Sequence, residues 1–263
     1  MKDRLQKNNP IAVFDSGVGG ISVLRELIRI MPWEDYLYFG DSKNAPYGMK
    51  EKERVCELTC MHAKHLFEQG AKGLVVACNT ATSAAVKVLR EKYPQIPIVG
   101  IEPAVKPAVL SKEHPKVLVM ATPMTIREEK FLRLVERFEC DADIIPLSCP
   151  GLMDFVERGD LDGEDLKKYL RELLYDFRND TVDAVVLGCT HYPFVGRQIK
   201  ETLGEHVQIF DGGAGTAREM QRRLKESDLL IEEEKEGKVL FERGLMEEEK
   251  ILLCQKLLSL PIF

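Results

Sequence analysis

Two cysteines in this chain each follow a short, continuous run of apolar and small residues. Residues 73–77 lead to Cys78, and residues 184–188 lead to Cys189. A run of this kind is typical of a strand that is buried on both faces of a parallel sheet. Helix-forming sequence follows each cysteine, so each thiol is predicted at the carboxyl end of a strand, where open α/β sheets bind ligands. We therefore expect one site that contains two acid/base groups.

Proton transfer is the chemistry that two such thiols could perform. A helix N-terminus lowers the pKa of a thiol from about 8.5 towards neutrality, and its backbone N–H groups, with Asn79, Thr80 and Thr190, could hold a carboxylate. One thiolate would remove the proton from the carbon next to that carboxylate, and the other thiol would return a proton to the opposite face. Each cysteine would act as base in one direction and acid in the other, which a pKa near the working pH suits. The alternative is that each cysteine is a small apolar core residue.

Strands and helices alternate along the chain, which predicts parallel βαβ units. Strands are expected at 11–14, 36–40, 73–77, 96–101, 116–121, 143–146, 184–188, 207–210 and 239–242. Helices are expected, among other places, at about 50–70, 123–138, 166–177 and 194–203.

The strands form two series, and each series contains one of the two cysteines. Cys78 and Cys189 are 111 residues apart, which is about the length of one domain. We therefore expect two similar α/β domains with mainly parallel sheets, related by pseudo-twofold symmetry, with the active site in the cleft between them. The first domain is predicted to comprise residues 1–100 plus 211–263, and the second residues 101–210.

Composition narrows the class of protein. The chain has 263 residues, of which 44% are hydrophobic, and a formal net charge of -6 without a clustered basic stretch, so nucleic acid is not the expected partner. No apolar run is long enough to span a bilayer, and the N-terminal residues lack the apolar core of a signal peptide. The seven cysteines are scattered and odd in number, which favours the reducing cytoplasm over a disulfide framework.

Four motifs together resemble the glutamate racemases of the cofactor-independent aspartate/glutamate racemase family. They are Val13-Phe14-Asp15-Ser16-Gly17-Val18-Gly19-Gly20, Gly40-Asp41 with Pro46-Tyr47-Gly48, Ala77-Cys78-Asn79-Thr80-Ala81, and Leu187-Gly188-Cys189-Thr190-His191-Tyr192-Pro193. The resemblance implies interconversion of L- and D-glutamate, which supplies D-glutamate for peptidoglycan. It also implies that the enzyme uses neither a cofactor nor a metal and forms a homodimer, with a small molecule as its partner rather than nucleic acid or a membrane.

The same resemblance assigns roles to particular residues. Cys78 and Cys189 match the catalytic pair of the family. Proton transfer is assisted by residues that match Asp15, His191 and Glu157. Substrate is contacted by residues that match Asp15, Ser16, Tyr47, Gly48, Asn79, Thr80, Thr190 and His191.

Several of these residues have simpler explanations when each is taken alone. Asp15 could cap the first helix, His191 could be a capping or packing residue, and Glu157 could lie on a solvated helix face. The roles of Asp41 and Cys149, and that of the strand at 239–244, are left open. The functional alternatives are a racemase of aspartate or a related amino acid, and a non-catalytic amino-acid-binding protein.

Two other motifs are weaker. Gly17 and Gly19 match the first two glycines of a dinucleotide-binding loop, but Ser22 stands where the third glycine belongs. A helical cluster of Cys56, Cys60, His62 and His65 contains metal-binding residue types, but its spacing is not that of a zinc site.

Overall fold

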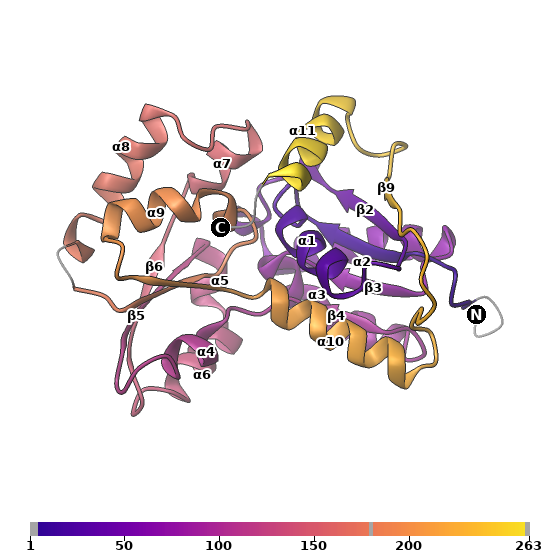
Figure 1. Ribbon diagram of the computed structural model, residues 1–263, viewed down its shortest axis with the longest axis horizontal. Coiled ribbons are helices and arrows are strands. Elements are labelled where there is room, and N and C mark those ends of the chain that lie inside the picture. The colour runs from indigo at the N-terminus through magenta and orange to yellow at the C-terminus, as the bar shows by residue number, and fades with distance from the viewer. Residues whose placement is uncertain (1–4, 179–180, 261–263) are drawn as a thin grey trace. The chain divides into compact units, whose positions relative to one another are not determined.

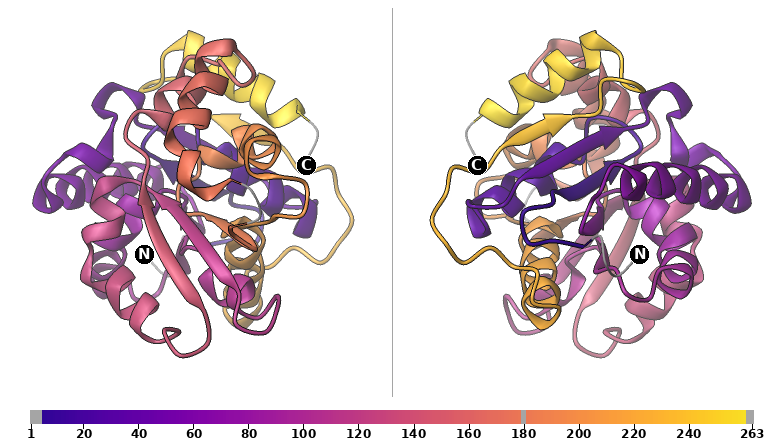
Figure 2. Two further views of the ribbon diagram at one scale, coloured as in Figure 1. Left: turned by 90° about the vertical axis from the view of Figure 1, so that its left-hand side faces the viewer. Right: turned by 90° about the vertical axis from the view of Figure 1, so that its right-hand side faces the viewer.

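The structure, a computed structural model, describes residues 5–178 and 181–260. It divides into two compact units. The first unit is formed by the described residues of Met1–Glu102 and by Gly213–Ser259, and the second by those of Pro103–Gly212. Each unit contains one parallel sheet with helices packed against it (Figures 1 and 2).

The sheet of the first unit has the strand order β4-β3-β1-β2-β9, and all its neighbouring strands are parallel. Its strands are β1 (Ile11–Asp15), β2 (Tyr36–Gly40), β3 (Gly73–Val76), β4 (Ile98–Gly100) and β9 (Val239–Phe241). The three central strands β1, β2 and β3 are buried along their whole length, as expected for a sheet that is covered on both faces. The strand near residue 239, whose role was open, therefore extends this sheet beside β2.

Helices surround this first sheet. They are α1 (Ile21–Ile30), α2 (Lys52–Glu68), α3 (Asn79–Lys92), α10 (Gly213–Glu226) and α11 (Glu248–Ser259). Helix α1 packs against α10 and α11, whereas α2 packs against α3. Two short 3₁₀ turns, η2 (Ser42–Asn44) and η3 (Tyr47–Met49), connect β2 to α2.

The second unit repeats part of this topology. Its strands are β5 (Lys116–Ala121), β6 (Asp143–Ser148), β7 (Ala184–Leu187) and β8 (Gln208–Asp211), in the parallel order β6-β5-β7-β8. Its helices are α4 (Val105–Val109), α5 (Pro123–Arg127), α6 (Glu129–Glu136), α7 (Leu152–Glu157), α8 (Glu164–Leu173) and α9 (Gly196–Leu203), with 3₁₀ turns η4 (Tyr175–Phe177) and η5 (Tyr192–Val195). The order β2-β1-β3-β4 of the first unit thus recurs as β6-β5-β7-β8.

Both sheets have a topological switch point, which is the place where successive strands change from one side of the first strand to the other. From β1 the chain crosses to β2 on one side, whereas from β2 it crosses to β3 on the other side of β1. Because such crossovers are right-handed, the connections that follow β1 and β3 leave towards opposite faces of the sheet. The crevice between their carboxyl ends is where open α/β sheets bind ligands. The equivalent crevice of the second unit lies between β5 and β7.

Three of the expected helices are divided in the structure, and the one expected over 166–177 forms α8 and the 3₁₀ turn η4. The segment expected as one helix over 123–138 forms α5 and α6, which are separated at Glu128, where the backbone is extended with ψ 132°. The segment expected over 194–203 begins instead with the 3₁₀ turn η5, and the α-helix starts only at Gly196. Pro193 lies in the first turn of η5 and has no N–H group to donate.

A buried ion pair between Lys72 and Glu34 holds the C-terminal segment of the first unit against the rest of that unit. The Lys72 ammonium and the Glu34 carboxylate are 2.5 Å apart and almost fully buried. Lys72 also donates a hydrogen bond to the carbonyl of Leu229, and Glu34 accepts one from the N–H of Ile231. The pair therefore fixes the chain just after α10, at the start of the segment that leads to β9.

We predict that Lys72→Met lowers the free energy of unfolding by about 3–5 kcal/mol, because it leaves the Glu34 carboxylate buried without its cation. Urea denaturation followed by circular dichroism measures this change. Lys167→Met is the matched control, since the ion pairs of Lys167 with Asp162 and Glu164 lie at the surface, and we expect little change for it. A Lys72→Met protein as stable as the wild type would contradict this account of the pair.

Candidate active site

Cys78 lies at the switch point of the first unit, directly between β3 and α3. It is the N-cap residue of α3, and its sulfur accepts a hydrogen bond from the N–H of Ala81 at 3.5 Å. A helix N-terminus of this length carries a partial positive charge, which favours the thiolate over the thiol. The expectation of a strand-to-helix junction at Cys78 is thus confirmed.

The end of the neighbouring strand β1 brings Asp15 and Ser16 to the same place. Ser16 Oγ lies 3.4 Å from Cys78 Sγ, and both side chains are buried. Asp15 Oδ1 accepts a hydrogen bond from the N–H of Gly17 at 2.8 Å. Asp15 does not cap the first helix, because α1 begins after Gly20 and has no side-chain cap. Residues 16–20, which follow Asp15, instead form the turn that connects β1 to α1.

Asp41, the residue after β2, is a further buried group at this end of the first sheet. Its carboxylate accepts hydrogen bonds from the Tyr47 hydroxyl at 2.7 Å and from the Asn44 amide at 2.9 and 3.0 Å, and it lies 2.9 Å from Nε2 of His62. Burial acts to raise the pKa of Asp41, but these hydrogen bonds outweigh it, so the pKa lies below its usual value. Burial, together with Asp41, raises the pKa of Tyr47, which therefore stays a neutral phenol.

Cys189 lies at the equivalent switch point of the second unit, after β7. Its sulfur is 3.6 Å from Nδ1 of His191, and Nε2 of His191 is 2.8 Å from Oε1 of Glu157. The imidazole is almost completely buried, and Glu157 is the last residue of helix α7. Three residues that are separated by up to 34 positions in the sequence thus form one chain of polar contacts.

The contacts of His191 set its charge. Burial acts to lower the pKa of His191, but the hydrogen bonds and charges of Cys189 and Glu157 outweigh it, so the pKa lies well above its usual value. The buried imidazole is therefore held as a cation.

The structure corrects the expectation that a helix N-terminus lies beside Cys189. The residues after Cys189 form a turn and then η5, and α9 begins at Gly196, seven residues beyond the sulfur. In the second unit the imidazole of His191 supplies the positive charge that the helix supplies at Cys78 in the first unit. The two cysteines therefore occupy equivalent positions in the topology but have different electrostatic partners.

The remaining predicted residues lie near one or the other cysteine in the sequence and are mostly buried. Asn79, Thr80, Thr190 and Tyr47 are all less than 8% exposed, and Gly48 is partly buried in η3. The sequence interpretation did not select Thr122 and Thr125, which follow β5 and whose hydroxyl oxygens are 3.0 Å apart. Thr122 follows β5 as Ser16 follows β1. A comparison of the residues after these two strands could therefore have identified Thr122 as a candidate site residue.

Cys149 lies in the second unit at the position that Asp41 has in the first. The N–H of Cys149 donates to the carbonyl of Ala121, as the N–H of Asp41 donates to that of Asp15. Burial and the charge of Cys189 raise the pKa of the Cys149 thiol, which therefore stays protonated. This residue is a neutral neighbour of Cys189.

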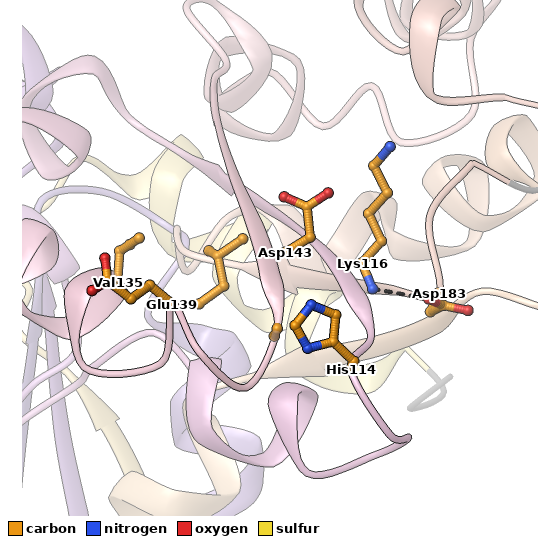
Figure 3. A pocket seen from close by; sticks show the side chains of 8 residues that line it. His114, Lys116, Val135, Glu139, Asp143 and Asp183 are labelled. Atoms are coloured by element: carbon orange, nitrogen blue, oxygen red, sulfur yellow. Dashed lines mark hydrogen bonds between the residues drawn. The ribbon is translucent and has the colours of Figure 1, made fainter.

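A hollow of about 600 Å³ lies at the other end of the second sheet (Figure 3). Its lining includes His114, Lys116 and Asp143, which stand at the amino ends of β5 and β6. Cys189 follows the carboxyl end of β7, so this hollow is separate from the residues around Cys189. Within the described residues, no group of three or more His, Cys, Asp or Glu side chains is placed to hold a metal ion. None of the helices described is long and apolar enough to cross a membrane.

Comparison with known proteins gives a consistent result. The family described as Asp/Glu/Hydantoin racemase matches residues 24–220. The chain is 48% identical over 260 residues to a glutamate racemase of Clostridium perfringens, which covers 99% of this chain and 100% of the relative.

Two solved structures are also similar. One is a glutamate racemase from Francisella tularensis in complex with D-glutamate, with a TM-score of 0.82, 27% identity, and coverage of 98% of this chain and 96% of that chain. The other is the Escherichia coli glutamate racemase in complex with L-glutamate and the activator UDP-MurNAc-Ala, with a TM-score of 0.79, 30% identity, and 95% coverage of both chains.

We predict that Glu157→Gln lowers the pKa of His191, because it removes one of the two groups that favour the imidazolium. The measurement is an NMR titration of the imidazole Cε1–H resonance, assigned by its loss in His191→Asn. Glu164→Gln, an exposed change in the same unit, should leave the titration unchanged. If the pKa of His191 were the same in Glu157→Gln and in the wild type, the carboxylate would not control the charge of the imidazole.

Proposed function

The chain belongs to the aspartate/glutamate/hydantoin racemase family, and from this premise we propose that it is a glutamate racemase that uses Cys78 and Cys189 as its two bases. The observation that carries the proposal is topological. Each cysteine follows the equivalent strand, β3 or β7, of two sheets that share one strand order. Each sulfur also has a polar neighbour, which is the N–H of Ala81 at Cys78 and the imidazole of His191 at Cys189. Two acid/base groups of this kind suit the transfer of a proton to and from opposite faces of one carbon.

The reaction proceeds through cleavage and re-formation of one C–H bond. The thiolate of one cysteine takes the α-proton, and the electron pair of the broken bond passes into the α-carboxylate as a planar carbanion forms. The thiol of the other cysteine then protonates the carbanion from the opposite face and becomes a thiolate. The product has the opposite configuration, and the two sulfurs have exchanged protonation states. Nothing is oxidised or reduced, so the step needs no electron donor or acceptor.

The amino acid would be held by groups that surround the two sulfurs. Among the described residues, the buried Oδ1 atom of Asn79 has no hydrogen-bond partner. A buried acceptor without a partner is unfavourable by about 1–3 kcal/mol, and a substrate ammonium group would satisfy it. The N-terminus of α3 suits a carboxylate. The hydroxyls of Thr80 and Thr190, and the turn containing Tyr47 and Gly48, are the proposed contacts for the rest of the substrate.

Different residues would assist the proton transfer at each of the two cysteines. Ser16 and Asp15 lie on the side of Cys78, and His191 with Glu157 lies on the side of Cys189. We assign Asp15 and His191 the role of assisting proton transfer, and Glu157 that of holding the imidazole. The proposal requires both sulfurs to reach the same α-carbon, as in the predicted cleft between two domains. Supply of D-glutamate for peptidoglycan, a homodimer and a cytoplasmic location remain predictions.

The test of the function is isotope exchange in heavy water. We expect the purified protein, without added metal or pyridoxal phosphate, to convert L-glutamate to D-glutamate. Early in the reaction deuterium should be present at the α-carbon of the product but not of the remaining substrate, because different thiols take and return the proton. Polarimetry and mass spectrometry of the separated enantiomers measure the two quantities.

Other outcomes would select the alternatives. Deuterium in substrate and product alike would indicate a single base that exchanges with solvent. Faster turnover of aspartate in a panel of amino acids would indicate a related racemase. Binding of glutamate without exchange of the α-proton would indicate a binding protein, and the proposed function would be wrong.

We also predict that Cys78→Ala and Cys189→Ala each reduce racemisation by about 10³-fold or more, because each removes a group that is required for every turnover. Initial rates in both directions measure the effect. Cys140→Ala is the matched control, since Cys140 is exposed, and its rates should equal those of the wild type. Normal activity in either of the first two variants would contradict the two-base mechanism.

A further inference from the structure

We propose that His62 is a positioning residue of the racemase site, which acts through Asp41 to hold Tyr47 and Gly48 in place. The inference rests on the proposed function, in which the turn containing Tyr47 and Gly48 contacts substrate. Neither His62 nor Asp41 is assigned a role in proton transfer. Four observations support this assignment: the shared carboxylate, the packing of the imidazole, the form of the loop, and the second unit.

The first observation is that one residue, Asp41, joins three segments of the first unit. Oδ2 of Asp41 is 2.7 Å from the Tyr47 hydroxyl and 2.9 Å from Nε2 of His62. Asn44 donates to both oxygens of the same carboxylate. The backbone N–H of Asp41 bonds to the carbonyl of Asp15 at 3.0 Å. Asp41 therefore connects helix α2, the loop of η2 and η3, and the strand end that carries Asp15.

The second observation is that the His62 imidazole is held rigidly. It stacks on the Phe14 ring with centroids 5.7 Å apart and an interplanar angle of 28°, and its centroid is 4.7 Å from that of Phe39. These rings come from β1 and β2, directly before Asp15 and one residue before Gly40. His62 is 5% exposed. Its backbone belongs to the 17-residue helix α2, so the direction of Nε2 is set by the core and not by the loop.

The third observation is that the loop itself has little regular structure. Residues 42–49 contain only two turns of 3₁₀ helix, of three residues each, and Met49 is 73% exposed. Tyr47 is nevertheless completely buried. The charge of Asp41 explains this, because a buried carboxylate is stable only when its donors surround it. Loss of the His62 donor leaves the carboxylate short of one partner and loosens the loop that supplies the others.

The fourth observation is that the fold does not require such a network. The equivalent position in the second unit is occupied by Cys149, whose sulfur donates to the carbonyl of Leu147. The same strand order thus forms there without a buried carboxylate. The residues around Asp41 are therefore better explained by the position of the loop that they hold than by the needs of the sheet.

The test compares His62→Leu, which removes the donor, with His62→Gln, whose amide can still donate to Asp41. We expect His62→Leu to raise KM for both enantiomers by about 10-fold and to change kcat by less than about 2-fold, since the loop holds substrate and the sulfurs perform the chemistry. His62→Gln should restore KM to within about 3-fold of the wild type. His65→Gln is the matched control, because His65 lies on the same helix and contacts Gln69 instead, and its KM should not change.

A second readout does not depend on racemase activity. Lys43 is exposed within the loop, and trypsin should cleave after it about 10-fold faster in His62→Leu than in the wild type or in His65→Gln. The double variant His62→Leu/Tyr47→Phe should bind glutamate no more weakly than the weaker single variant, because both changes act on one carboxylate.

The outcomes separate this inference from the proposed function. A wild-type protein that does not racemise glutamate refutes the function, and cleavage after Lys43 then still decides whether His62 holds the loop. An unchanged KM and an unchanged cleavage rate in His62→Leu, with only a lower Tm, would show a purely structural role and overturn the inference. A lower kcat at constant KM that His62→Gln does not restore would overturn it as well.

Discussion

Burial of polar groups at the carboxyl ends of parallel strands is the constraint on which this structure depends. Strands β1, β2 and β3 are covered on both faces, so the residues that follow them leave the sheet into a region with little solvent. A polar group in such a place must find a partner within the protein or in a ligand. Asp15, Asp41 and Cys78 each do so through contacts at one edge of the first sheet. The groups that we propose for the chemistry are therefore also groups whose burial the protein must compensate.

The two units satisfy this constraint in different ways. Around Cys78 the partners are a helix N-terminus and the hydroxyl of Ser16, with two carboxylates close by in the topology. Around Cys189 they are an imidazole and the carboxylate beneath it. One strand order thus supports two chemically different environments for a thiol. A two-base racemase needs two groups that can each take and return a proton, but it does not need the two to be alike, because an interconversion at equilibrium constrains only the ratio of the two directions.

The first unit contains a packed core and a loop that is joined to this core by polar contacts. The aromatic rings of Phe14 and Phe39 and the helix α2 form a well-packed core around His62. The loop of η2 and η3 lies at its border and is joined to it through the side chain of Asp41. Loops that contact ligands are commonly held in this way by a few polar contacts to a packed scaffold. The buried pair of Lys72 and Glu34 serves the same unit at a different place, where the chain continues after α10.

The sequence by itself determined the strands, the class of fold and the residues that could do chemistry, because these depend on local patterns. Continuous apolar runs predicted the central strands to within a few residues, and the repeated cysteine junction predicted two α/β units. The motifs also identified the family, since residue types at fixed spacing are a property of the chain. Glu157 was selected by resemblance alone, because its own helix is amphipathic and charged and offers no local signal.

Only the tertiary structure decided which of these residues meet, because the contacts that matter join positions far apart in the chain. Ser16 reaches Cys78 over 62 residues, and Glu157 reaches His191 over 34. The role of His62 could not be read from the sequence, where it stood among cysteines as a weak metal motif, since the direction of its ring is set by packing against Phe14 and Phe39. The helix that was expected beside Cys189 begins only at Gly196, after the 3₁₀ turn η5, because helix propensity is a weak local preference that tertiary context overrides.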